Sequence, residues 1–140
     1  MKRKGTGSGF FINKFVVFLL VILLLGSTIS MTKRLNRTKR KNKINTVIRF
    51  VIKNLREVDS LPEETHIKRR FPSINRSYRL ILSGDYNEYQ KVKIQIRTLE
   101  NFQKTILLNE RINGGNFRME RKNPGRIILS KSRKISLEVI

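Results

Sequence analysis

The stretch that decides the fold is INTVIRFVIKNLREV, residues 44–58. Its apolar residues recur with the three- and four-residue spacing of one face of an α-helix, sustained over about four turns. The residues on this face are Ile44, Val47, Ile48, Val51, Ile52, Leu55 and Val58. We therefore expect an amphipathic helix here, whose apolar face must be buried against another element of the chain.

Upstream of this stretch lies an apolar segment. Residues 15–25, FVVFLLVILLL, contain no polar side chain, and the wider segment 10–31 has only Asn13 and Lys14 as strongly polar residues. As a helix, such a segment rises about 33 Å, which is enough to cross a hydrocarbon core of about 30 Å. The sequence therefore predicts that 10–31 spans a membrane.

The apolar and amphipathic segments are expected to form one helix. No Pro or Gly lies between Ser27 and Ser60, so no residue that breaks helices separates the two segments. The sequence predicts a single helix from about Phe10 to about Val58, apolar on all sides at first and amphipathic afterwards.

Two other interpretations of the N-terminus compete with this one. One is a plain signal anchor, and the other is a cleaved secretory signal with Lys2, Arg3 and Lys4 as its basic region and cleavage near Thr28–Ser30. A chain that began near residue 31 would start as a bare basic helix, which makes the cleaved signal the less natural interpretation.

The charge of the chain is strongly positive and unevenly distributed. The net charge is +21, and residues 1–56 contain fourteen Lys or Arg and no acid. Such a field favours anionic partners, namely phospholipid headgroups, nucleic acid or anionic wall polymers. A Lys-rich proteome from an A/T-rich genome would give the same composition without a specific partner. The candidate anion-binding residues are Lys33, Arg34, Arg37, Lys39, Arg40, Lys41 and Lys43, and further on Lys68, Arg69 and Arg70.

Beyond the helix, the spacing of apolar residues changes to the period of two that is typical of strands. Residues 59–75 hold two of the three prolines and are expected to form a connecting loop. We expect Ser83-Gly84-Asp85 to end the first strand, Asn113-Gly114-Gly115 to form a hairpin, and Asn123-Pro124-Gly125 to form another turn. The expected strands are Tyr78–Leu82, Lys91–Arg97, Thr105–Ile112, Phe117–Glu120, Arg126–Leu129 and Lys134–Val139.

These five or six short strands predict an antiparallel sheet with one polar and one apolar face. The only element available to cover the apolar face is the helix at 44–58. We therefore expect an α+β fold, in which one long N-terminal helix packs on a small antiparallel sheet. The expected organisation is a basic leader at 1–9, a transmembrane helix at 10–31, a basic amphipathic helix at 32–58 and a β domain at 59–140.

Residues that carry catalysis or bind metals are scarce. The chain has no Cys, and its only His, His66, is expected to be solvated in the connecting loop. A lone His cannot form a multi-His metal site, and Gly114-Gly115 lacks the Lys and the helix of a phosphate-binding loop. We therefore expect a non-enzymatic protein with no catalytic residue, cofactor or metal.

The order of these segments resembles type IV pilins and the pseudopilins of type II secretion and competence systems. The specific motif is a short basic leader that ends in Gly9 and is followed by Phe10 and the apolar segment. The C-terminal part, ILLNERINGGNFRMERKNPGRIILSKSRKISLEV, is similar to the end of minor pseudopilins. The resemblance implies that a prepilin peptidase cuts after Gly9, that Phe10 becomes a methylated N-terminus, and that subunits stack through their N-terminal helices into a fibre.

Two features depart from the pattern of this family. The fifth mature position, which is usually a Glu that pairs with the terminal amine of a neighbouring subunit, is Lys14 here. A cation cannot make that pair, so the resemblance points to a minor subunit at a fibre tip or in initiation. The second departure concerns topology, because this family keeps its β domain outside the cytoplasm. Three bases precede the apolar segment and seven follow it, and by the positive-inside rule this excess favours a cytoplasmic β domain.

The leading expectation is a minor pilin-like subunit of an envelope fibre that acts in assembly, with its β domain on the extracytoplasmic side of the membrane. The alternative is a single-pass membrane protein whose basic domain binds anionic lipid or nucleic acid. The expected partners are other pilin-like subunits through the N-terminal helix, a prepilin peptidase, membrane lipid and, without sequence preference, DNA. The candidate DNA contacts are Lys68, Arg69, Arg70, Arg118, Arg121, Lys122, Arg126, Lys131, Arg133 and Lys134.

Overall fold

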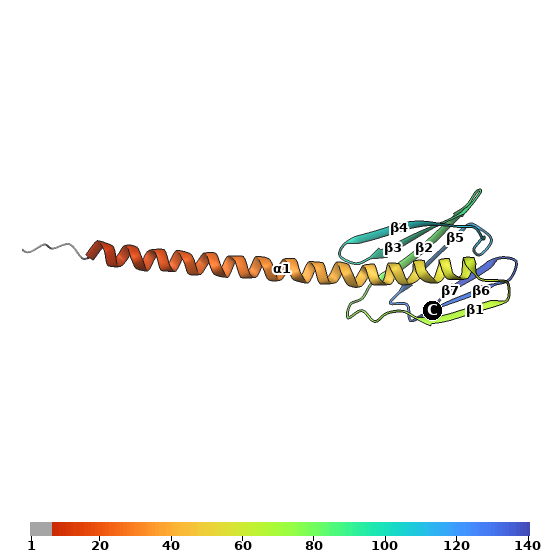
Figure 1. Ribbon diagram of the computed structural model, residues 1–140, viewed down its shortest axis with the longest axis horizontal. Helices are drawn as coiled ribbons and strands as arrows, with labels where there is room; N and C mark the ends of the chain where they lie inside the picture. The colour runs from red at the N-terminus through yellow and green to blue at the C-terminus, as the bar shows by residue number, and fades with distance from the viewer. Residues whose placement is uncertain (1–6) are drawn as a thin grey trace, which may run out of the picture. The chain divides into compact units, whose positions relative to one another are not determined.

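The computed structural model describes residues 7–140, with side chains from residue 11 onward. It contains one helix, α1 (Gly7–Ser60), which confirms the expected single long helix (Figure 1). The chain divides into two compact units, one up to Lys41 and the other from Asn42 to Ile140, and each unit is described by itself below. Residues 1–6 of the expected leader lie outside the described residues.

Seven strands follow the helix and form two antiparallel sheets. They are β1 (Thr65–Arg70), β2 (Arg79–Tyr86), β3 (Gln90–Arg97), β4 (Asn101–Leu108), β5 (Phe117–Lys122), β6 (Arg126–Lys131) and β7 (Ile135–Val139). One sheet has the order β4-β3-β2-β5 and the other has the order β1-β6-β7. In Figure 1 the two sheets lie on either side of the C-terminal part of α1. The α+β fold is confirmed, with two small sheets in place of the one expected.

The core of the second unit is built on the predicted helix face. All seven apolar residues that define this face are buried, and Val47, Val51 and Leu55 are fully buried. They join one hydrophobic cluster with side chains from both sheets, for example Ile94 from β3 and Leu129 from β6. Because the helix buries its face against both sheets at once, one amphipathic helix suffices for seven strands.

The expected loop at 59–75 contains a strand, which is a correction to the sequence analysis. β1 pairs with β6 over its whole length, from Thr65 opposite Lys131 to Arg70 opposite Arg126. Only Ile67 in β1 is both apolar and buried. The pattern was too weak to predict a strand, because one buried residue does not establish a period of two. His66 is therefore an exposed strand residue, not a loop residue.

Gly84 does not end a strand, as was expected, but lies inside β2. It pairs with Val92 on one side and with Phe117 on the other. A Cβ atom at this position would collide with the ring of Phe117, so the glycine allows that ring to approach the sheet. A second shift concerns β4, which begins and ends four residues earlier than the expected strand at 105–112.

The predicted hairpin at 113–115 is instead a tight turn in a crossover, because β4 and β5 lie at opposite edges of their sheet. Asn113, Gly114 and Gly115 all have positive φ angles, as the Asn-Gly-Gly sequence suggests. The backbone N–H of Asn113 donates to the carbonyl of Ile135 at 2.9 Å. The Asn113 side chain exchanges two hydrogen bonds with the backbone of Leu137, at 2.9 and 3.0 Å. The crossover therefore covers the free edge of β7. An uncovered edge strand would present unpaired backbone groups to other chains.

Candidate functional site

The apolar segment of α1 is the most distinctive feature of the first unit. Every side chain from Phe11 to Met31 is exposed, including Phe15 and Leu24 at 64% each. The helix is long and apolar enough to cross a membrane. Isolated exposed leucines are ordinary on a protein surface, but a continuous apolar surface of this size needs lipid or another chain to cover it.

The hydroxyl groups near the end of this segment are satisfied within the helix itself. Ser27 and Thr28 donate to the carbonyls of Leu24 and Leu25 at 2.8 and 2.9 Å. Thr32 donates to the carbonyl of Thr28 at 2.8 Å. Because these hydroxyls bond to their own backbone, they do not require water and are compatible with an apolar environment.

The residues singled out for processing and helix packing all lie on α1. The helix begins at Gly7, so the backbone at Gly9 and Phe10 is helical. Lys14 is exposed in the turn that follows. Nothing in the fold of residues 7–41 tests cleavage between Gly9 and Phe10, which stays a prediction.

The candidate anion-binding residues fall into two groups. Those on α1, from Lys33 to Lys43, are all exposed along one helix. Lys68, Arg69 and Arg70 are not a cluster, because successive residues of β1 project from opposite faces of the sheet. The guanidinium of Arg69 donates two hydrogen bonds to the carboxylate of Glu57, at 2.8 and 2.6 Å.

Two further candidate DNA contacts are also engaged within the protein. Lys131 is buried, and its ammonium group donates to the carbonyl of Asp59 at 2.8 Å, at the C-terminal end of α1. A cation there interacts favourably with the helix dipole. Arg121 donates through Nε to the carbonyl of Val139 at 3.0 Å, which joins the two sheets. Arg69, Arg121 and Lys131 therefore have structural contacts that the sequence did not reveal.

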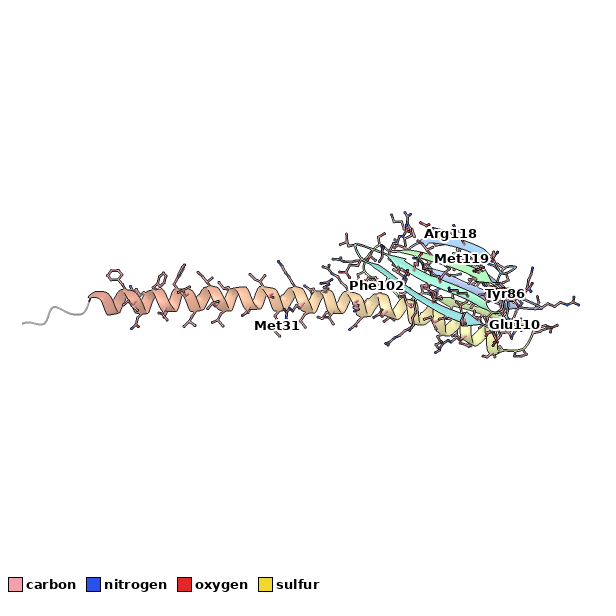
Figure 2. The ribbon with its side chains drawn as sticks, turned by 90° about the horizontal axis from the view of Figure 1, so that it is seen from above. Met31, Tyr86, Phe102, Glu110, Arg118 and Met119 are labelled. Carbon is pink, nitrogen blue, oxygen red and sulfur yellow. The ribbon has the colours of Figure 1, made fainter. Side chains whose placement is uncertain are left out.

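The structure assembles a basic surface that the sequence analysis did not identify as a group. The strand register places Arg97, Arg79 and Lys122 directly opposite one another on β3, β2 and β5. All three are exposed, on the face of the sheet that points away from the helix. Arg118, labelled in Figure 2, projects from the same face, whereas its neighbour Met119 packs against the core. The basic residues of this surface, called the basic sheet face below, are Arg79, Lys91, Lys93, Arg97, Arg118 and Lys122.

Only two acids interrupt the basic sheet face. They are Asp85 and Glu120, and Glu120 accepts a hydrogen bond from Arg79 at 2.6 Å. Like charges directly opposite each other on neighbouring strands destabilise a sheet, so the row of three cations has a cost. The alternation in β3 was visible in the sequence, but the order β3-β2-β5 was needed to bring the cations together.

Potential metal ligands do not gather in the part of the chain that the structure describes. Among residues 7–140, no cluster of three or more His, Asp or Glu side chains could hold a metal ion. Burial raises the pKa of the Tyr78 phenol above its usual range, so Tyr78 stays neutral at ordinary pH.

Comparisons of the chain with models of protein families, with characterised proteins and with solved structures find no match.

Proposed function

We propose that this protein is a minor pilin-like subunit of an envelope fibre and that it acts in fibre assembly. The observation that carries the proposal is the division of α1. Its residues 11–31 expose apolar side chains on all sides, whereas residues 44–58 bury one face in an antiparallel β domain. The first part would hold the subunit in the membrane and later pack against the helices of other subunits. The cation at Lys14 favours a tip or initiating subunit over a repeating one.

The test of this proposal is the mass of the mature chain. Intact-mass analysis of protein extracted from its native membrane should give a chain that begins at Phe10 and carries one added methyl group. Gly9→Val should block this cleavage and leave membrane insertion intact, whereas Gly7→Val should be cut normally. A chain that retains Gly9, or one that begins at 29–31, would contradict the proposal.

A second candidate is a single-pass membrane protein whose basic domain binds nucleic acid or anionic lipid on the cytoplasmic side. Two observations favour it, namely the excess of bases after the apolar segment and the basic sheet face. Protease added to intact cells separates the two candidates. Digestion of the β domain before lysis supports the fibre subunit, and protection until lysis supports the cytoplasmic domain.

Binding to double-stranded DNA is a separate expectation for the basic sheet face. The face carries no aromatic side chain on which bases could stack, so its contacts would be to phosphates and would be independent of sequence. Affinity should fall steeply with salt, since each neutralised phosphate releases counterions. The slope of the logarithm of the binding constant against the logarithm of the salt concentration measures the number of phosphate contacts. Replacing Arg97 and Lys122 with Gln should reduce the magnitude of this slope by about two, since each lost contact removes about 0.9. The same change at Arg49 and Lys53, two exposed cations on the helix, should leave the slope unchanged.

A further inference from the structure

The part of α1 that follows the apolar segment has two unlike faces. Successive residues of a helix are rotated by about 100°, so positions 33, 34, 37, 40 and 41 fall within an arc of about 120°. All five positions are basic and exposed, and they are called the basic arc here: Lys33, Arg34, Arg37, Arg40 and Lys41. Only Lys39 and Lys43 of the basic run lie outside this arc.

The opposite face of the same turns is weakly polar. It contains Thr28, Met31 and Leu35, with the three- and four-residue spacing of one helix face, and Lys39 follows on the same face four residues after Leu35. Met31 and Leu35 are 64% and 51% exposed, and the hydroxyl of Thr28 is bonded to the backbone. Figure 2 shows the Met31 side chain projecting from the helix. One side of the helix therefore continues the apolar surface as far as Leu35, while the other side becomes strongly basic from Lys33 onward.

The position of the basic arc along the helix is fixed by its distance from the apolar segment. If residues 11–31 fill the hydrocarbon core, Lys33, Arg34 and Arg37 lie about 3 to 9 Å beyond its edge. The headgroup layer on each side of a bilayer is about 5 to 7 Å thick, so Lys33 and Arg34 fall at the level of the lipid phosphates. Arg37, Arg40 and Lys41 lie further out, and their long aliphatic stems allow the charged groups to reach back.

The electrostatics of the helix favour an external anion at this arc. Lys33, Arg34, Arg40 and Lys41 place four positive charges on one side of the helix. The first acid of the chain is Glu57, so the helix itself supplies no carboxylate near the arc. Lipid phosphates would offset the repulsion among these four charges.

We propose that the basic arc of α1 binds the headgroups of anionic phospholipids at the C-terminal end of the apolar segment. The opposite face, with Met31 and Leu35, is then left for apolar contacts. This inference depends on the membrane span and not on fibre assembly, so it holds for a fibre subunit waiting in the membrane and equally for a single-pass protein. Cleavage at Gly9 can fail its test while this inference passes, because the arc lies far from the junction.

The test uses the full chain in phosphatidylcholine vesicles that contain a minority of phosphatidylglycerol. Electron paramagnetic resonance with spin-labelled lipids measures the association of each lipid with the protein. The wild type should prefer phosphatidylglycerol by on the order of fivefold or more at low salt, and the preference should shrink as salt is added. The variant K33Q/R34Q/R40Q/K41Q, which keeps Arg37, should lose most of this preference.

The matched control removes the same charge from the basic sheet face, as K91Q/K93Q/R97Q/K122Q, and should retain the preference. Thermal unfolding of both variants checks that the β domain is intact, which is expected because seven of the eight side chains are exposed and Lys93 is only partly buried. The proposal is overturned if the wild type has no lipid preference, if the arc variant retains it, or if only the sheet variant loses it. It is also overturned if the arc variant loses binding to a DNA duplex and keeps its lipid preference, since the arc would then be a nucleic-acid surface.

Discussion

Val21 and Val51 lie in the same helix, but the first is exposed and the second is buried. Val21 is 47% exposed in the apolar segment, whereas Val51 is fully buried between the helix and the sheets. The difference comes from the residues around them. Val21 is surrounded by apolar residues on all sides of the helix, whereas Val51 lies on a single apolar stripe that is flanked by Arg49 and Lys53. Periodicity, and not hydrophobicity alone, determines which part of α1 packs within its own chain.

The largest effect is expected for Val51→Asp. A carboxylate at this position would be buried with no partner, which should destabilise the β domain by about 4 kcal/mol or more and unfold it. Ile52→Asp should have a similar effect, because Ile52 is also buried on this face. Thermal unfolding followed by near-ultraviolet circular dichroism measures the change. Lys53→Asp is the control and should be mild, since Lys53 is exposed; equal effects at all three positions would mean that the packed face is misassigned.

Val21→Asp, thirty residues earlier in the helix, should impair membrane insertion and leave the stability of the β domain unchanged. Val21→Asp places a charge near the middle of the apolar segment, where insertion into a membrane should become less favourable by about 3 kcal/mol. The β domain should unfold at the wild-type temperature, because residues 42–140 form their own compact unit. Fractionation of membranes after alkaline washing measures the loss of insertion. If Val21→Asp lowered the unfolding temperature of the β domain, the two parts of α1 would not be independent.

Polar groups provide a finer comparison, because the hydroxyls of the apolar segment bond to their own helix, whereas Gln90 in the β domain connects elements that are distant in the sequence. Gln90 is fully buried; its amide oxygen accepts from the N–H of Ile112 at 3.0 Å, and its amide nitrogen donates to the carbonyl of Gly115 at 2.8 Å. Gln90→Leu should leave both backbone groups unsatisfied and destabilise the domain by about 2 to 3 kcal/mol. Chemical denaturation measures this loss.

Gln95, on the same strand, is the matched control. It is only partly buried, and its side chain makes one hydrogen bond, to Gln103 at 3.3 Å on the exposed face. Gln95→Leu should change the stability by less than about 0.5 kcal/mol. If both substitutions had the same effect, the crossover at 112–115 would not depend on Gln90.

Sequence patterns predicted the parts of this fold in which one period runs over many residues. The helix face at 44–58 and the strand at 91–97 were both correct, because each repeats its apolar residues several times. β1 was missed, because it contains a single buried apolar residue, and Gly84 was misinterpreted, because its packing against Phe117 depends on a strand that is distant in the sequence. The basic arc could be derived from the helix alone. The basic sheet face could not, because sheet order joins residues that the sequence separates.

The smallest effect concerns the ion pair between Arg69 of β1 and Glu57 near the end of α1, which ties the helix to a strand that the sequence did not predict. The pair is bidentate, but the two side chains are 38% and 32% exposed, so solvent screens it. Arg69→Met should destabilise the β domain by only about 1 kcal/mol, whereas Arg56→Met, at an exposed neighbour on the helix, should be neutral. A double-mutant cycle with Glu57→Gln, measured by chemical denaturation, isolates the contribution of the pair. Because the planar guanidinium makes both hydrogen bonds, Arg69→Lys should recover less than the whole coupling. A coupling free energy near zero would mean that the buried helix face alone holds β1 in place, and that Arg69 is as available to an external anion as Lys68.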